Sequence, residues 1–158
     1  MRLVPIKFPG YPAGATDFEP IFENGDATER EALLGVIERI ADQIIQGDES
    51  TEFTAIVVVG HSDRQDRSDM NCDQKRASEI AAARDRAVSA WEFVKLRVTE
   101  RLAQSQIEGG EWWDTSPRVT WAMVFAAAGM LQHDPPASEA ERLDNRRVMF
   151  LVRMFSSA

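Results

Sequence analysis

The residues of this chain that could do chemistry gather in one segment, AIVVVGHSDRQDRSDMNC, which runs from Ala55 to Cys72. An apolar run is followed there by a loop crowded with Asp and Arg. His61, Ser62 and Asp63 are the three residue types of a catalytic triad, but neighbours along a strand point to opposite faces, so three consecutive residues cannot form the relay. The chain also lacks the G-x-S-x-G elbow of a serine hydrolase. We therefore predict that the protein is not an enzyme.

The same segment does not indicate a metal site. His61, Cys72 and His133 lack the short spacings that metal ligands adopt. The loop carboxylates are spaced by three residues rather than by the two of an EF-hand, and the glycine of that motif is missing; they are Asp63, Asp66 and Asp69. We predict neither a metal ion nor another cofactor.

The composition restricts the class of partner. A formal net charge of −8 argues against nucleic-acid binding and against docking on an anionic membrane surface. No apolar stretch approaches the roughly 20 residues that span a bilayer, so we expect no direct membrane insertion. The N-terminus has no apolar signal-peptide core, which favours a cytoplasmic chain, an unusual export route or a fragment of a longer protein.

The elements that must position this segment follow from turn residues and periodicity. We expect an irregular N-terminal arm over residues 1–17 and a single domain over 18–158, with a short edge strand at Pro20–Phe22. Thr28 to Glu31 has the form of a capping box, and an apolar stripe then predicts a helix that ends at Gly47. The β-branched run 53–59 predicts a buried strand.

The second half alternates in the same way. A helical stripe covers about 73–106, for which we expect a break between Ala77 and Arg84, because one straight helix would measure roughly 50 Å. GGEWWDTSP is expected to be a loop. Residues 118–127 and 147–155 read as strands, separated by a loop over 129–144. The predicted fold is α+β: a β-α-β-α-β-β mixed sheet with helices packed on one face.

Several motifs, taken in order, resemble one known family. They are GHSD (60–63), Asn71, Arg86-Ala87 and the NRRV of Asn145 to Val148, together with FENGDA (22–27) and Ala128-Gly129 followed by Pro135. This set is similar to the OmpA-like peptidoglycan-binding domain and covers residues 18–155.

The resemblance implies a module of the cell envelope that grips the peptidoglycan stem peptide, usually at diaminopimelate. By this resemblance, Asp63 would bind the ammonium group of diaminopimelate and Arg86 would bind its carboxylate group. The chemistry agrees, since the planar guanidinium of arginine binds a carboxylate bidentately. We expect Asn71, Phe22, Gly25 and Arg146 to lie near the ligand.

The departures from the family pattern leave alternatives open. Asp66 stands where glycine is expected, and the longer gap before Arg86 indicates an inserted segment near residues 72–82, which makes Arg76 a second candidate arginine. The insertion could close the pocket. The runner-up function is therefore a structural or interaction component of a secretion or contractile injection assembly that has lost its ligand.

Two further roles remain open for residues near the site. Asn71 could be the N-cap of the long helix as well as a ligand contact. Alternation along the last strand sends Arg146 and Arg147 to opposite faces, so at most one of them should point into the pocket, and we favour Arg146.

Overall fold

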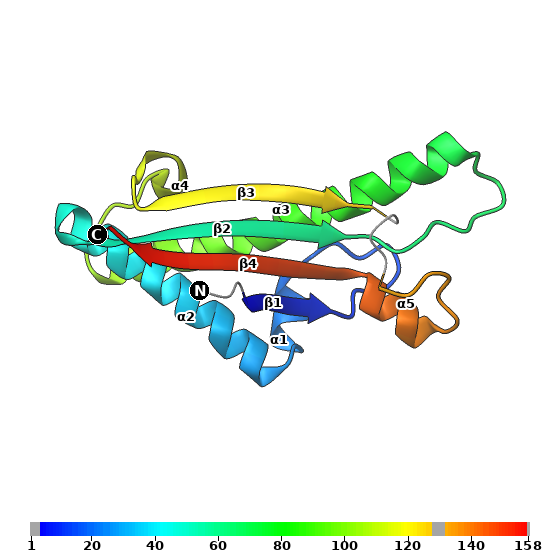
Figure 1. The fold of residues 1–158 in the computed structure, drawn as a ribbon, viewed down its shortest axis with the longest axis horizontal. Helices are drawn as coiled ribbons and strands as arrows, with labels where there is room; N and C mark the ends of the chain where they lie inside the picture. Colours follow the sequence, from blue (N-terminus) through cyan, green and yellow to red (C-terminus); the bar gives the residue numbers. More distant parts are fainter. Residues whose placement is uncertain (1–3, 128–131, 158) are drawn as a thin grey trace.

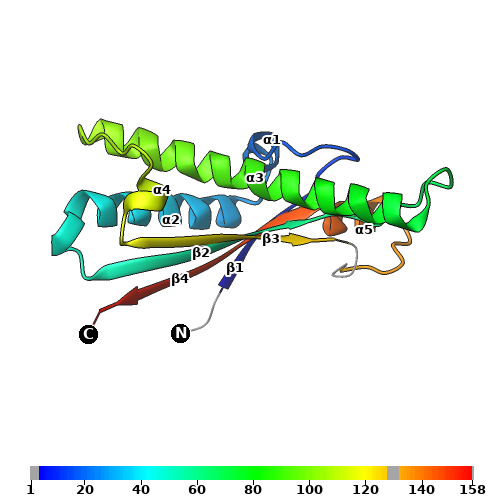
Figure 2. The ribbon, with the colours of Figure 1, turned by 90° about the horizontal axis from the view of Figure 1, so that it is seen from above.

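In the described part of the chain, one mixed four-stranded sheet is covered on one face by the two long helices (Figures 1 and 2). The structure, a computed structural model, describes residues 4–127 and 132–157. The strands are β1 (Val4–Pro9), β2 (Glu52–His61), β3 (Val119–Ala126) and β4 (Arg147–Ser156). The helices are α1 (Glu19–Glu23), α2 (Ala27–Gln46), the 3-10 turn η1 (Gly47–Glu49), α3 (Cys72–Gln104), α4 (Trp112–Thr115) and α5 (Glu139–Asn145). This architecture confirms the predicted α+β fold.

The strand order in the sheet is β1-β4-β2-β3. β2 pairs parallel with β3, as the connection through α3 requires, and β4 runs antiparallel to both β2 and β1. The carboxyl ends of β2 and β3 therefore meet the start of β4 at one end of the sheet. The loop that follows β2 leaves the sheet at this end.

The N-terminal arm is where the sequence-based prediction was wrong. Residues 4–9 are not irregular but form β1, whose Ile6 pairs with Phe150 of β4. The strand expected at Pro20–Phe22 is instead the short helix α1, in which Pro20 occupies the first turn. Proline suits that position because the first helical N–H groups have no partner in the helix.

The helix α2 begins slightly earlier than predicted. Its N-cap is Asp26, whose carboxylate accepts hydrogen bonds from the main-chain N–H groups of Thr28 and Glu29 at 2.8 and 3.2 Å. The expected capping box at Thr28 is therefore not used. The helix ends at Gly47, as predicted, and this residue has a positive φ of 55°.

The expected break in the second long helix does not exist. α3 is continuous over 33 residues. The size of the sheet does not limit the length of α3, because the first turns of this helix project beyond the end of the sheet (Figure 1). The predicted apolar stripe of α3, which includes Trp91, Val94 and Leu102, is buried in the core.

A close approach of backbones fixes α3 on the sheet. A Cβ atom at Gly60 of β2 would lie 1.9 Å from the carbonyl oxygen of Ala83 and 2.9 Å from the amide nitrogen of Ala87. Only glycine fits there.

Farther along the chain, the segment GGEWWDTSP, which was expected to be a loop, contains the short helix α4, in which Trp112 is buried against Trp91. No helix among the described residues is both long and apolar enough to cross a membrane.

Candidate functional site

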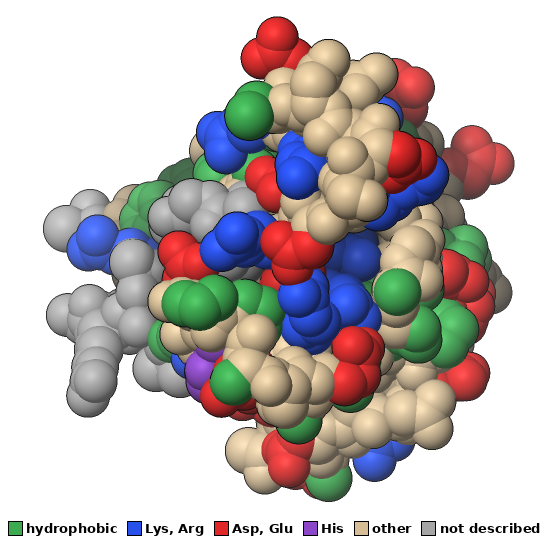
Figure 3. All heavy atoms as spheres, turned by 90° about the vertical axis from the view of Figure 1, so that its right-hand side faces the viewer, with side chains coloured by type: hydrophobic (Ala, Val, Ile, Leu, Met, Phe, Trp, Pro, Cys, Tyr) green, Lys and Arg blue, Asp and Glu red, His purple; other side chains and the backbone are tan. Residues whose placement is uncertain are grey.

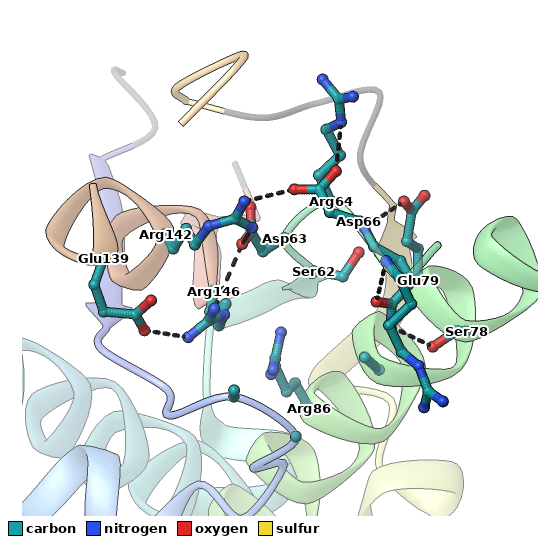
Figure 4. Close-up of a pocket in the computed structure, with 15 residues that line it drawn as sticks. Ser62, Asp63, Arg64, Asp66, Ser78, Glu79, Arg86, Glu139, Arg142 and Arg146 are labelled. Atoms are coloured by element: carbon teal, nitrogen blue, oxygen red, sulfur yellow. Dashed lines mark hydrogen bonds and ion pairs between the residues drawn. The ribbon is translucent and has the colours of Figure 1, made fainter. Parts of the chain in front are cut away.

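A cavity of about 500 Å³ opens at the carboxyl end of β2. Its walls are the β2–α3 loop, the first turns of α3, the lead-in after β1, and α5 with the start of β4 (Figure 4). Figure 3 views this end of the molecule and shows Arg and Lys side chains near its middle with carboxylates beside them. The lining residues used below are Ser62, Asp63, Ser78, Glu79, Arg86, Glu139, Arg142 and Arg146.

Arg86 is a buried cation that faces this cavity from α3. It is 2% exposed. Its Nε donates to the carbonyl of Ala15 at 3.0 Å, and Nη1 donates to the carbonyl of His61 at 2.9 Å. Its guanidinium also lies 5.0 Å from the ring centroid of Tyr11.

Among residues 4–127 and 132–157, no carboxylate lies within 4.0 Å of the Arg86 guanidinium. The guanidinium nevertheless carries a positive charge at neutral pH. Burial lowers the pKa of Arg86 to about 10, which is still well above neutrality. A buried guanidinium that has only carbonyl partners retains a full positive charge to offer to an anion in the cavity.

Asp63, the predicted acidic partner, is held differently. Its side chain is 6% exposed. Oδ1 accepts a hydrogen bond from Asn145 Nδ2 at 3.1 Å, and Oδ2 accepts one from Arg142 Nη1 at 2.7 Å. Arg146 Nη2 approaches Oδ2 at 3.5 Å. Asp63 and Arg86 thus line the same cavity, but Asp63 already has three partners within the protein.

The two consecutive arginines at the junction of α5 and β4 have different surroundings. Arg146 lines the cavity and donates to Glu139 at 2.9 Å. Arg147 does not line it, and its Nη1 donates to the main-chain carbonyls of Asp144 and Asn145. Strand alternation, on which the prediction rested, does not cause this separation, because Arg146 is the C-cap of α5 and β4 begins only at Arg147.

Three of the predicted ligand contacts do not line the cavity. Asn71 caps α3: its side chain accepts from Gln74 N, and the Gln74 side chain accepts from Asn71 N, each at 2.9 Å. Phe22 lies in the core against Phe93, and Gly25 lies against Phe8. The second candidate arginine, Arg76, is exposed and does not line the cavity. The predicted Ala128-Gly129 motif lies outside the described residues.

The segment that we predicted to be an insertion, near residues 72–82, forms part of a wall of the cavity. It lies in the first turns of α3, where Ser78 and Glu79 contribute to the lining. Glu79 Oε1 accepts a hydrogen bond from the main-chain N–H of Gln65 at 2.9 Å, which ties the β2–α3 loop to the helix. This segment therefore shapes the cavity and leaves it open.

The sequence-based prediction missed the contribution of α5. This helix carries Glu139 and Arg142 in a region that was expected to be mainly loop. A signal was present: Ser138 begins an S-x-x-E pattern, and its hydroxyl accepts from Glu141 N at 3.2 Å. In the part of the chain that the structure describes, no group of three or more His, Cys, Asp or Glu side chains is placed to hold a metal ion.

Comparison with known proteins finds similarity to solved structures only. No family model matches the chain, and no curated protein matches its sequence. The peptidoglycan-associated lipoprotein from Burkholderia pseudomallei is similar at 11% identity and a TM-score of 0.42, over 94% of this chain and 89% of that one. A putative MotB like protein from Desulfovibrio vulgaris has 18% identity and a TM-score of 0.42, over 96% and 75%. The cell wall anchor of the T6SS from Pseudomonas aeruginosa has 16% identity and a TM-score of 0.37, over 98% and 81%. These values assign the chain neither a family nor a function.

Proposed function

We propose that this protein is a non-catalytic, OmpA-like peptidoglycan-binding module that holds the diaminopimelate end of the stem peptide between Asp63 and Arg86. The observation that carries the proposal is the buried guanidinium of Arg86, which faces an open cavity with no carboxylate within 4.0 Å among the described residues. Burying a charge without a counter-ion is unfavourable, and a ligand carboxylate would supply that counter-ion.

The remaining features of the cavity support a ligand that also carries an ammonium group. The Asp63 carboxylate lies in the lining, and its longest contact, 3.5 Å to Arg146, is the one that an incoming ammonium would weaken most easily. The ordered motifs GHSD at 60–63 and NRRV at 145–148 support the same assignment, because Asp63 and Arg146 come from these two motifs. The proposal places the working protein at the cell envelope, where it would contact peptidoglycan.

The test is sedimentation of the purified protein with sacculi that contain diaminopimelate. Arg86→Gln should weaken this binding about tenfold or more, because it removes the cation that receives the carboxylate. Arg84→Ala is the matched control, since Arg84 is an exposed residue of the same helix that pairs with Asp85 and does not line the cavity. Circular dichroism should verify that each variant is folded. The proposal fails if the wild-type protein does not sediment, or if folded Arg86→Gln or Asp63→Ala binds as tightly as wild type.

A second candidate function is favoured by one observation. The Asp63 carboxylate is already paired with the cations Arg142 and Arg146 and hydrogen-bonded by Asn145, as expected of a site that has exchanged ligand binding for internal stability. The protein would then be an interaction component of an envelope or secretion assembly. Capture of a defined protein partner, measured by native mass spectrometry, together with no sedimentation on sacculi, would select this function.

A further inference from the structure

We infer that two copies of this chain associate through β3, whose outer edge pairs antiparallel with the same edge of the second copy and joins the two sheets into one. No residue of β3 lines the cavity. The inference therefore goes beyond the proposed function and does not depend on it.

The two edges of the sheet differ in the hydrogen-bonding groups that they present. The strand order places β1 at one edge and β3 at the other (Figure 1). At the β1 edge, the outward main-chain N–H of Lys7 donates to Glu29 Oε2 at 3.1 Å. Pro5 and Pro9 lie at the positions that face outward by alternation, and proline has no N–H. The edge at β1 is therefore blocked against a further strand.

The outer edge of β3 is not blocked in this way. The carbonyls of Arg118 and Ala126 accept hydrogen bonds from the β2 side of the sheet. Because main-chain groups alternate between the two sides of a strand, those of the odd-numbered positions point away from the sheet. These positions are Val119, Trp121, Met123 and Phe125. No hydrogen bond joins their outward groups to another described residue, and such a row is a template for a second strand.

The sequence of β3 also lacks the usual protection of an edge strand. Soluble proteins normally block a long edge with charged side chains, prolines or bulges. The strand VTWAMVFA has no charge and no proline. Its pairing with β2 is continuous from Val119 to Ala126, so no bulge bends it away. In a chain of net charge −8, this strand allows two copies to approach without like charges opposite each other.

Apolar side chains border this edge on both faces of the sheet. Val124 is 44% exposed on the open face, and Phe125 is 42% exposed on the face that carries α3. On α3, the exposed Val88 lies one turn before Trp91, whose ring stacks on Trp121 of β3 at 5.0 Å. Strand pairing at this edge would therefore bury apolar surface as well as satisfy backbone groups.

The edge is complementary to itself. Each outward position offers one donor and one acceptor, and an antiparallel second copy presents the same pair in return. A two-fold axis near Ala122 and Met123 opposes only apolar residues and threonine, because β3 contains nothing else. Ala122, which is exposed on the open face, then lies directly or diagonally across from its counterpart in the second copy. A second copy of the chain is therefore the partner that fits this edge.

The experiment is sedimentation equilibrium of the full chain across the micromolar range, where we expect a dimer of twice 17.7 kDa. Ala122→Glu and Ala122→Lys each place like charges across the axis, so each should raise the dissociation constant about tenfold or more. An equimolar mixture of the two variants should restore a dimer that contains one copy of each, which native mass spectrometry can identify. Arg153→Glu is the matched control, because Arg153 is exposed on the same open face but lies on β4, which β2 separates from β3.

Hydrogen exchange of the wild-type protein gives a second measurement that needs no variant. The outward amides of Trp121 and Met123 should become protected as the protein concentration rises. A wild-type monomer throughout the range, a dimer that both Ala122 variants retain, or a dimer that Arg153→Glu abolishes overturns the inference. Protection of these amides that does not change with concentration, or that appears only when another protein supplies the strand, overturns it as well.

Discussion

Arg142 Nη1 donates a 2.7 Å hydrogen bond to Oδ2 of Asp63, which joins α5 to the end of β2 across 79 positions of the chain. The same guanidinium extends through its Nη2 atom to the carboxylate of Asp66 in the β2–α3 loop. Because the Asp63 side chain is only 6% exposed, its negative charge depends on these protein donors in the absence of a ligand. One arginine therefore connects two walls of the cavity.

We predict that Arg142→Ala destabilises the protein by about 2 kcal/mol at pH 7, because it leaves the Asp63 carboxylate buried with fewer donors. The measurement is urea denaturation, read as the free energy of unfolding. Arg67→Ala is the control: Arg67 pairs with Asp69 on the exposed surface, and its loss should not change the unfolding free energy measurably. Equal unfolding free energies for the two variants would contradict a structural role of Arg142.

The close contact at Gly60 leads to a second prediction. Gly60→Ala should destabilise the protein by about 3 kcal/mol or more, because the new Cβ would meet the main chain of α3 at Ala83, and backbone atoms cannot yield as a flexible side chain can. The measurement is thermal and urea unfolding.

The chain supplies a matched control for this substitution. Gly35 is exposed on α2, and a Cβ built on it would have no atom within 4 Å other than those of its chain neighbours and the adjacent helix backbone. Gly35→Ala should stabilise the protein by up to about 1 kcal/mol, since alanine favours the helical state more than glycine does. If Gly60→Ala also proved neutral or stabilising, the close approach of β2 and α3 would be wrong.

The elements that the sequence predicted well are those with a local signal. The β-branched run of β2 and the apolar stripe of α3 consist of residues that are close together in the sequence. Periodicity therefore predicts that one is a strand and the other a helix, and which face of each is buried. β1 was missed because Pro5 and Pro9 read as breakers. Both are tolerated there because β1 is an edge strand, and its partner β4 lies at the far end of the chain.

The site was predictable only in part, for a related reason. Asp63 and Arg86 could be nominated because each belongs to a motif attached to a recognisable strand or helix. Periodicity gives no information about which cation neutralises a buried carboxylate, and the contact of Asp63 with Arg142 is created by tertiary packing alone. Likewise, only the structure shows that the buried hydroxyl of Ser62 forms no hydrogen bond with a described residue.

Asn71 allows its two candidate roles to be separated by experiment. We predict that Asn71→Ala lowers the free energy of unfolding by about 1 kcal/mol, because it removes the side chain that caps α3, and that Asn71→Asp retains most of that stability. Binding to sacculi should be unchanged, since Asn71 does not line the cavity. A folded Asn71→Ala protein that fails to sediment with sacculi would show instead that Asn71 contacts the ligand.

The burial of His61 leads to a prediction of how the free energy of unfolding depends on pH. It is 4% exposed, and burial, assisted by the nearby charge of Arg147, lowers its pKa from 6.5 to about 4. Between these two values the unfolded chain binds a proton that the folded protein does not. The contribution of neutral His61 to stability is therefore fully present above about pH 6.5 and declines as the pH falls towards 4, by up to roughly 3 kcal/mol.

The measurement is urea denaturation of wild type and His61→Gln at pH 7, 5 and 4. Glutamine does not titrate, so the variant should lose less stability than wild type between pH 7 and 4, whatever its stability at pH 7. The carboxylates of the protein titrate in both proteins and cancel in this difference. Two parallel stability curves would mean that His61 is protonated as easily in the folded protein as in the unfolded chain, which would contradict its burial at the end of β2.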